Sequence, residues 1–331
     1  MGGELAQVDF ERGGLSPYRD GRAFLRLVGL YRNTAPTLIH HFNAKPVLLG
    51  SLAARVAARE AAVVNTITGL GNLPSVGGWR EPILHTALRG ACRRAQRTIF
   101  QNREDRDHYV ERGWIGTDRA RLIVSSGVDT ELFHPVERGP ENGLTVLMVS
   151  RLLAQKGVES FLETARQVRA VRPEVIFQLA GEWEPDHPDA LRSELVEESV
   201  ARGEVEFLGY VGEIEKLLPR VSLFVFPSHY REGVPRVILE AAACGVPTVA
   251  VDIAGSRVAI EPGQTGWLVP PDSVEALTDV VLDALGDKKR LAHMGRLARE
   301  RVLEEFDLVD ITRKQLDVYR ELGLGFEEPS P

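Results

Sequence analysis

The sequence predicts an α/β protein built from two domains, each with a parallel β-sheet covered by helices. The chain has 331 residues, which is too many for one ordinary core and suits two domains. Apolar, β-branched runs alternate with amphipathic helical patterns from end to end. The segment PVERGPENG at 135–143 is charged, rich in Pro and Gly and without periodicity, so it is the expected linker.

Each strand and helix is expected from its own pattern. Short apolar runs without polar alternation are typical of strands that are buried on both faces. The predicted strands are 37–42, 62–68, 97–102, 121–126, 144–150, 175–181, 205–210, 222–228, 247–252 and 266–270. Amphipathic patterns at 158–171 and 191–203 are clear examples of the helices expected between them. Ligands bind outside the carboxyl ends of such strands, so functional residues are expected there.

The composition is that of a soluble globular protein, with 44% apolar and 26% charged residues. Apolar runs such as VSLFVF at 221–226 are far shorter than the roughly 18 residues of a membrane-spanning helix. The opening MGGELAQVDFERGG has no apolar core segment, so no signal peptide is expected. Two cysteines in a chain of this size, Cys92 and Cys244, indicate a reducing compartment. We therefore expect a cytoplasmic protein.

The net charge of −7 is distributed unevenly along the chain. Residues 1–100 carry 12 Arg and 1 Lys against 6 Asp and Glu (13 − 6 = +7), which leaves −14 for the remainder. This basic half is either an ordinary solvated surface or a surface for an anionic partner, such as a phosphate-bearing acceptor or an anionic membrane. The stretch at 88–99 places Arg89, Arg93, Arg94 and Arg97 at helical spacing. Aromatic residues are not interleaved there, so nucleic-acid binding is not expected.

The stretch SRLLAQKG at 150–157 lies between a predicted strand and a predicted helix. It places Arg151 and Lys156 in the strand-to-helix turn. Two cations beside a helix N-terminus can hold a diphosphate. Ordinary surface charge is the alternative interpretation of the same residues.

The stretch SHYREGVPRVILEAAACGVP at 228–247 places two acidic residues around the start of an apolar helix. Pro235 suits the first helical turn, and Gly245 with the following proline ends the helix. Glu232 and Glu240 are eight positions apart, or roughly 12 Å along a helix. That is about the distance from the sugar of a nucleotide sugar to its ribose, with the backbone N–H groups of 233 and 234 facing the phosphates between. In the alternative interpretation, Glu240 is solvated and Glu232 interacts favourably with the helix dipole.

The motif EGVPRVILE, Glu-x7-Glu, resembles that of the retaining glycosyltransferases of family 4, which have the GT-B fold. The resemblance covers nearly the whole chain. It includes SSGVDTELFHP (125–135), SRLLAQKG, LAGEWE, FLGYVG and DSVEALTDVVLDAL. The strings HHFNAKPVLLGSLAARVA (40–57) and NTITGLG (65–71) resemble a bacterial branch that builds surface polysaccharides on lipid carriers. The implied architecture is two Rossmann-like domains facing across a cleft.

The resemblance implies roles for individual residues. Arg151 and Lys156 hold the donor diphosphate, Glu240 binds the ribose, and Glu232 acts catalytically next to the donor sugar. The remaining implied donor-binding residues are Gly209, Val211, Gly233 and Val234. Retention implies a front-face reaction in which the leaving diphosphate takes the acceptor proton. No cofactor and no metal is expected, because the two cations supply the positive charge.

The N-terminal half departs from the family pattern. Many members carry His-x-His after a strand, whereas this chain has His40, His41 and Phe42, so only His40 fits and it is a second catalytic candidate. A hydrogen-bonded strand-end histidine is the alternative. Candidate acceptor-side residues are His41, Asn43, Lys45, Thr68 and Gly69. GLGNLP at 69–74 fails the Gly-x-Gly-x-x-Gly pattern, and EDRD at 104–107 is more typical of a helix start than of a metal site.

The resemblance implies that the family's first strand and helix would precede residue 1, so the N-terminal domain is expected to be incomplete and the strand at 37–42 to lie at a sheet edge. The expected domains are residues 1–137 on the acceptor side, residues 138–305 for the nucleotide sugar, and residues 306–331 as a helix that crosses back to the first domain.

The predicted function is transfer of a sugar from a nucleotide-diphosphate donor, UDP rather than GDP, to a glycan or lipid-linked acceptor in cell-surface polysaccharide synthesis. Peripheral contact with the inner face of the membrane through the basic half is a further expectation. Two alternatives stay open: a nucleotide-sugar epimerase, and a non-catalytic nucleotide-binding protein with a shortened N-terminus.

Overall fold

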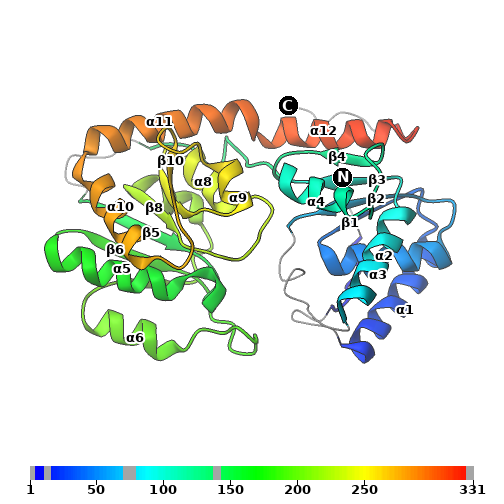
Figure 1. Ribbon diagram of the computed structural model, residues 1–331, viewed down its shortest axis with the longest axis horizontal. Coiled ribbons are helices and arrows are strands. Elements are labelled where there is room, and N and C mark those ends of the chain that lie inside the picture. Colours follow the sequence, from blue (N-terminus) through cyan, green and yellow to red (C-terminus); the bar gives the residue numbers. More distant parts are fainter. Residues whose placement is uncertain (1–3, 11–15, 70–79, 137–142, 326–331) are drawn as a thin grey trace. The chain divides into compact units, whose positions relative to one another are not determined.

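A computed structural model describes residues 4–10, 16–69, 80–136 and 143–325, and it divides the chain into two compact units (Figure 1). The first unit runs to Val124 and also includes Gln315–Glu327. The second unit is Ser125–Lys314. Each unit contains a parallel sheet with helices, which confirms the predicted α/β class.

The first unit contains four strands in the described part of the chain. Its elements are α1 (Pro17–Thr34), β1 (Leu38–Phe42), α2 (Ala44–Ala57), β2 (Ala62–Ile67), α3 (Arg80–Arg94), β3 (Arg97–Phe100), α4 (Arg103–Glu111) and β4 (Ala120–Leu122). The sheet order is β1-β2-β3-β4, with all neighbours parallel. Strand β1 is the edge strand in the described residues, as expected for the strand at 37–42.

The two faces of the first sheet are covered by different parts of the chain. Residues such as Ile39, Val63 and Phe100 point to one face and pack against helices α1 to α4. On the other face, Tyr319 near the end of the chain packs edge-on against the ring of His40, with 5.6 Å between ring centroids. The carboxylate of Glu321 accepts hydrogen bonds from the Arg97 and Arg121 side chains at 2.9 and 2.7 Å. Residues 200 or more positions apart in the sequence are therefore in contact within this unit.

The second unit begins earlier than the sequence suggested. The boundary was expected after residue 137, but Val128 already pairs with the start of the last helix: its N–H donates to Phe306 at 3.0 Å, and its carbonyl accepts from Leu308 N–H at 3.0 Å. Arg299 also donates to the carbonyl of Phe133 at 2.6 Å. These bonds attach residues 125–133 to the second unit. The expected linker lies largely outside the described residues, which omit 137–142.

The second unit contains six strands in the described part of the chain. The elements with which it begins are β5 (Thr145–Val149), η2 (Ala154–Lys156), α5 (Val158–Val171), β6 (Ile176–Ala180), α6 (Ser193–Ala201), β7 (Glu206–Gly209), α7 (Ile214–Leu217) and η3 (Leu218–Arg220). They are followed by β8 (Leu223–Phe226), α8 (Arg236–Ala243), β9 (Thr248–Val251), α9 (Ala254–Ala259), β10 (Gly266–Val269), α10 (Val274–Gly286), α11 (Lys288–Glu305) and α12 (Leu308–Arg320). All ten strands of the described chain fall inside the ten predicted ranges to within one residue.

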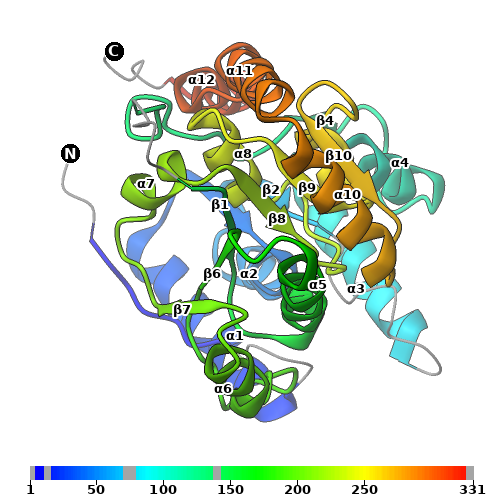
Figure 2. The ribbon, with the colours of Figure 1, turned by 90° about the vertical axis from the view of Figure 1, so that its left-hand side faces the viewer.

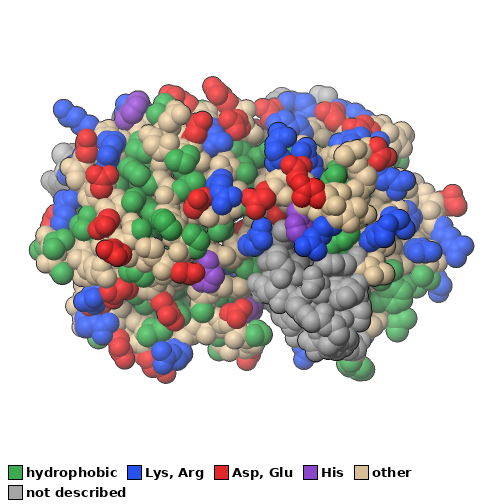
Figure 3. Space-filling model, viewed as in Figure 1, with side chains coloured by type: hydrophobic (Ala, Val, Ile, Leu, Met, Phe, Trp, Pro, Cys, Tyr) green, Lys and Arg blue, Asp and Glu red, His purple; other side chains and the backbone are tan. Residues whose placement is uncertain are grey.

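Helix α12 belongs partly to each unit, because its residues up to Lys314 cluster with the second unit and those from Gln315 with the first. None of the described helices is long and apolar enough to cross a membrane. Charged side chains of both signs are spread over the surface seen in Figure 3.

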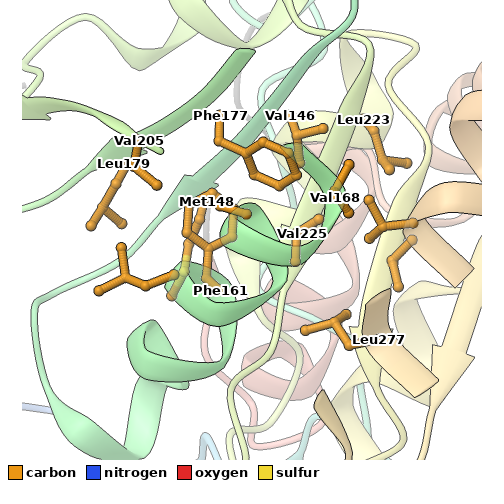
Figure 4. Close-up of a cluster of buried hydrophobic side chains, with 14 of the residues drawn as sticks. Val146, Met148, Phe161, Val168, Phe177, Leu179, Val205, Leu223, Val225 and Leu277 are labelled. Atoms are coloured by element: carbon orange, nitrogen blue, oxygen red, sulfur yellow. The ribbon is translucent and has the colours of Figure 1, made fainter. Parts of the chain in front are cut away.

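The core of the second unit lies between its sheet and helices α5 and α10. Strand residues alternate between faces, and those on this side include Val146, Met148 and Phe177 (Figure 4). They meet Phe161 of α5 and Leu277 of α10, and Figure 2 shows these two helices side by side. Helix α8 packs on β8, β9 and α11 on the opposite side. The sheet is therefore buried on both faces, as its continuous apolar runs predict.

A glycine allows the loops after β5 and β8 to touch. Gly157 has φ +75°, and a Cβ built on it would overlap the backbone carbonyl of Pro227. The Ser228 hydroxyl also donates to the carbonyl of Gln155 at 3.4 Å, and the His229 N–H to the same carbonyl at 3.3 Å. Close approach of these backbones fixes the positions of the side chains that the loops carry.

A second unusual backbone position follows β1. Asn43 has φ 71° and ψ 158°, a conformation that is essentially restricted to glycine and costs other residues about 1–3 kcal/mol. Its N–H donates to the carbonyl of Thr66 at 3.2 Å, and its side-chain oxygen accepts from the hydroxyl of Thr68. Strain is therefore held at the carboxyl end of β1 by bonds to the end of β2.

We expect Gly157→Ala to destabilise the protein more than Gly203→Ala does. Both glycines have positive φ, at +75° and +69°, which costs an alanine about 1–2 kcal/mol. Only the new methyl group at 157 meets a backbone carbonyl, which adds about 1–3 kcal/mol. Urea unfolding of both variants measures the difference. Equal losses of unfolding free energy would show that the contact between the two loops is not tight.

We expect Asn43→Gly to be more stable than Asn43→Ala by about 1 kcal/mol or more. Both substitutions remove the hydrogen bond to Thr68, but only glycine also relieves the backbone strain. The two variants are compared by thermal and urea unfolding. An alanine variant as stable as the glycine variant contradicts the strained conformation.

Candidate functional site

Most of the predicted donor-binding residues follow the two strands at which the direction of strand addition in the second sheet changes. The strand order is β10-β9-β8-β5-β6-β7, so the chain proceeds from β5 outward through β6 and β7, and then from β8 outward through β9 and β10. Neighbouring strands β5 and β8 therefore form a topological switch point, where ligands bind in open α/β sheets. Arg151 and Lys156 follow β5, and Glu232 follows β8.

Lys156 and Glu232 form an ion pair across this point. The Lys156 ammonium contacts the Glu232 carboxylate and lies 5.2 Å from the centre of the Tyr230 ring. Lys156 is only 9% exposed. Burial of an ammonium is costly unless it is paired, so a carboxylate, or another anion in its place, is required here.

Arg151 pairs with a residue from a third loop. Its guanidinium donates to the carboxylate of Glu184 at 3.1 Å, and Glu184 lies beyond the end of β6. The Arg151 side chain is 45% exposed and that of Glu184 is 18% exposed. The two predicted cations of the donor site therefore have separate carboxylate partners.

Glu240 lies on helix α8, one turn beyond Arg236. The Arg236 guanidinium approaches its carboxylate to 3.1 Å. The Glu240 side chain is 14% exposed, and burial raises its pKa although Arg236 acts in the opposite direction. Pro235 directly precedes the helix, whose last residue is Ala243, and Gly245 beyond it has φ +71°. The helix therefore begins and ends where its proline and glycine predicted.

The backbone between the two glutamates is buried at Gly233 and Val234. A Cβ on Gly255, in helix α9, would overlap the carbonyl of Gly233, so α9 packs directly on this loop. The other predicted donor residues, Gly209 and Val211, lie at and beyond the end of edge strand β7, two strands away from β5. The Gly209 carbonyl accepts from Gly181 N–H at 2.8 Å, which ties this end of β7 to β6.

His40, the second predicted catalytic residue, has protein partners at both ring nitrogens. Its Nδ1 lies 2.5 Å from the Tyr319 hydroxyl and its Nε2 lies 2.7 Å from the Thr66 hydroxyl. Burial, with a contribution from His41, lowers its pKa to about 4, so the ring is neutral at pH 7. In this arrangement His40 has no free nitrogen with which to exchange a proton with a substrate.

His41 lies on the opposite face of β1, inside the core. Its ring contacts the Tyr31 hydroxyl and the Asn65 side chain, each at 2.9 Å, and burial lowers its pKa. A Cβ on Gly50 would overlap the ring, so helix α2 leaves space for it. His41 is 5% exposed and contributes to packing, in contrast to the acceptor contact expected from the sequence.

The other acceptor-side candidates lie at the carboxyl ends of β1 and β2. Asn43 and Thr68 are bonded to each other, and Gly69 follows with φ +125°. Lys45 is bound to Asp20 of helix α1 at 3.0 Å. The structure thus brings together Asn43, Thr68 and Gly69, while Lys45 joins α2 to α1.

Three further features of the sequence were the arginine spacing at 88–99, EDRD and GLGNLP, and the structure describes the first two. Arg97 lies on β3, outside helix α3, and the Arg94 guanidinium donates to the carbonyls that follow α2, so the expected basic helix face is smaller than its spacing suggested. In EDRD, Asp105 donates its N–H to the Asn102 side chain at 2.7 Å, an N-terminal cap of α4. Of GLGNLP, residues 70–74 lie outside the described residues.

The sequence did not identify four side chains that complete these sites. Tyr230 lies beside Lys156, and Glu184 beside Arg151. The spacing of Arg236 and Glu240 is a recognisable i, i+4 pair. The contact between Tyr319 and His40, across 279 positions, has no local signal.

The structure is similar to those of solved glycosyltransferases. It matches sucrose-phosphate synthase from Thermosynechococcus elongatus with a TM-score of 0.78 and 23% identity, over 93% of this chain and 80% of that one. It matches HepE from Anabaena, in complex with UDP, with a TM-score of 0.73 and 20% identity, over 91% and 82% of the two chains. With its two parallel-sheet units, the chain has the GT-B fold.

The sequence also resembles curated proteins. It is 31% identical to glycogen synthase of Mycobacterium tuberculosis (strain CDC 1551 / Oshkosh) over 63% of this chain, and it spans about half (50%) of that relative's length. It is 24% identical to the Escherichia coli UDP-Gal:alpha-D-GlcNAc-diphosphoundecaprenol alpha-1,3-galactosyltransferase over 92% of this chain and 80% of that protein.

A family model described as "Glycosyl transferases group 1" matches residues 129–301, more than half of the chain. The match covers the switch point and all of the ion pairs described around it. The chain therefore belongs to the group 1 glycosyl transferases.

Proposed function

We propose that the protein transfers a sugar, with retention of configuration, from a nucleotide-diphosphate donor to a glycan or lipid-linked acceptor. The proposed donor is a UDP-sugar, the proposed role is cell-surface polysaccharide synthesis, and the proposed family is family 4. The observation that carries the proposal is the Lys156–Glu232 pair at the switch point between β5 and β8. Arg151 and Glu240 lie on the same two connections, which follow β5 and β8.

Similar proteins support the choice of donor and acceptor. The Escherichia coli relative is named for UDP-Gal and a diphosphoundecaprenol acceptor. A Campylobacter jejuni relative, 25% identical over 96% of this chain, is named as an N-acetylgalactosaminyltransferase that acts on a diphospho-undecaprenol sugar. HepE has been solved with UDP-glucose. These names describe the relatives, and they favour UDP and a lipid-linked sugar for this chain.

The donor site works by exchange of partners. The diphosphate takes the place of Glu232 at Lys156 and of Glu184 at Arg151, and the N–H groups of Gly233 and Val234 complete its binding. Glu232, released from Lys156, accepts hydrogen bonds from hydroxyls of the donor sugar. Glu240 accepts hydrogen bonds from the ribose hydroxyls, and the backbone at Gly209 and Val211 contacts the base.

The transfer step takes place on one face of the donor sugar. The bond between the anomeric carbon and the phosphate oxygen breaks, and the acceptor oxygen bonds to the same face of that carbon. The acceptor proton moves to the departing diphosphate. Lys156 and Arg151 stabilise the charge that develops on this leaving group, and we propose that they do so without a metal ion.

The acceptor site is proposed at the carboxyl ends of β1 and β2. Asn43 and Thr68 present polar groups there, and strain at Asn43 is typical of functional positions. His40 acts as a positioning residue, because its bonds to Thr66 and Tyr319 hold the end of β1. Lys45 orients the start of α2 through Asp20.

We expect Lys156→Ala and Glu240→Ala each to weaken UDP binding about tenfold or more. A hydrogen bond to a charged group contributes about 1.5–3 kcal/mol, which is at least a tenfold change in affinity. Calorimetric titration with UDP and with GDP measures the dissociation constants. Lys289→Ala, at an exposed position of helix α11, is the control and leaves them unchanged. Variants that bind UDP as tightly as the wild type contradict the assigned site.

Product analysis separates the proposed transferase from the alternatives. Incubation of a UDP-sugar with a lipid-linked acceptor releases UDP and extends the acceptor if the proposal is correct. Conversion of the sugar without any acceptor indicates an epimerase. Binding of UDP with no turnover of any UDP-sugar indicates a nucleotide-binding protein.

We also propose that the first unit contacts anionic membrane lipid through helix α1. Tyr18, Arg22 and Leu25 are spaced by four and three residues, so they share one face, and Tyr18 and Leu25 are 79% and 67% exposed. A shallow pocket beside them is lined by Arg22, Arg26 and Tyr18 among others. Figure 3 shows basic and apolar side chains together over this part of the unit. Aromatic and aliphatic side chains mixed with arginine suit an anionic lipid surface.

We expect Arg22→Glu to weaken binding to vesicles of phosphatidylcholine mixed with phosphatidylglycerol about thirtyfold. Each basic residue near such a surface contributes about 1 kcal/mol, and charge reversal roughly doubles the change. Co-sedimentation measures binding, with vesicles of phosphatidylcholine alone as the uncharged reference. Lys289→Glu makes the same charge change on exposed α11. Equal losses in both variants would mean that overall charge, not this face, sets the affinity.

A further inference from the structure

Glu184 is held next to Arg151 by a well-connected pair of loops. The chain after β5 and the chain after β6 bond to each other: Leu152 N–H donates to the Glu182 carbonyl at 3.1 Å, and Leu191 N–H to the Leu152 carbonyl at 3.0 Å. Trp183, next to Glu184, packs on Phe207 with 5.9 Å between ring centroids. The Glu184 carboxylate is therefore fixed in place before any ligand arrives.

Three ion pairs lie around the switch point, and Glu184 differs from the other two carboxylates. Glu232 and Glu240 are paired with Lys156 and Arg236, and both have hydroxyls of the donor to bind once they are released. Glu184 has no such role in the proposed complex. A diphosphate that binds Arg151 must displace Glu184 and leave its carboxylate beside an anion.

We propose that Glu184 is an internal competitor for the nucleotide diphosphate. It neutralises Arg151 while the site is free of ligand, lowers the affinity of the site for the diphosphate, and recaptures Arg151 when the nucleotide product departs. Glu184 is thus an affinity-setting residue of this transferase site, and not a ligand of the donor. This inference rests on the proposed function, because it takes Arg151 as a diphosphate ligand.

The exposure of the pair limits the size of the effect. Arg151 is 45% exposed, so solvent screens its attraction to Glu184. Partly exposed ion pairs contribute at most about 1 kcal/mol, which corresponds to about a fivefold change in affinity. We therefore expect Glu184→Gln, which keeps the shape and removes the charge, to bind UDP about two- to fivefold more tightly than the wild type.

The experiment measures UDP dissociation constants by calorimetric titration at low salt for four proteins besides the wild type. Glu184→Gln is compared with Glu182→Gln, which removes the same charge two residues away. The Glu182 side chain is exposed and forms no ion pair among the described residues. Both are expected to fold, since each lies on a loop. Arg151→Ala and the double variant of Arg151→Ala with Glu184→Gln complete a double-mutant cycle. In the absence of Arg151, we expect that Glu184→Gln no longer increases the affinity for UDP.

Each outcome decides between the two proposals. Tighter binding by Glu184→Gln alone, and only when Arg151 is present, supports the inference. A wild-type chain that binds UDP, with Glu184→Gln no tighter than Glu182→Gln, overturns the inference and leaves the proposed function standing. The same gain in the Arg151→Ala background also overturns it. A wild-type chain that binds neither UDP nor GDP overturns the proposed function together with the inference.

Discussion

The arrangement of the candidate donor site depends on a buried ammonium next to a carboxylate. Lys156 and Glu232 meet only because the loops after β5 and β8 touch, and that contact requires the absence of a side chain at Gly157. The strands must also be neighbours, although two other strands, with their helices and loops, separate them in the sequence. A buried Lys156 without an anion would be costly, so the fold provides an internal anion that a ligand can replace. Under the proposed function, a diphosphate that binds here exchanges places with a carboxylate that already pairs with the cation.

Much of the second unit follows from local patterns in the sequence. Strands β5 to β10 are apolar runs, helix α5 occupies its predicted range, and the limits of α8 follow from Pro235 and Gly245. The spacing of Glu232 and Glu240 is also local. What the sequence did not provide is the pairing of charges, because Glu184 reaches Arg151 through the register of two neighbouring strands, β5 and β6. The loop that contains Glu184 looks like ordinary polar surface until the sheet order is known.

In the first unit, the roles of neighbouring residues are even harder to predict from the sequence alone. His40 and His41 are adjacent in the sequence, yet side chains of a strand alternate, so one faces Tyr319 and the other Tyr31. Their different roles depend on what covers each face of the sheet, and one of these layers comes from the end of the chain. The boundary after Val124 has the same origin, since residues 125–133 bond to the segment around Phe306. Individual contacts between residues so far apart in the sequence cannot be predicted from a short stretch of sequence around either residue.

The charge balance around the switch point also limits how tightly a nucleotide can bind. Each cation assigned to the diphosphate already has a carboxylate within contact or hydrogen-bonding distance, so the gain on binding is the difference between two paired states. A transferase must release its nucleotide product in every cycle, and a site with unpaired cations would hold it more firmly. Under the proposed function, Glu232 has hydroxyls of the sugar to bind once Lys156 is taken by the diphosphate, whereas Glu184 only competes for Arg151. In the proposed mechanism, one carboxylate therefore couples charge exchange to sugar binding, and the other sets how easily the diphosphate leaves.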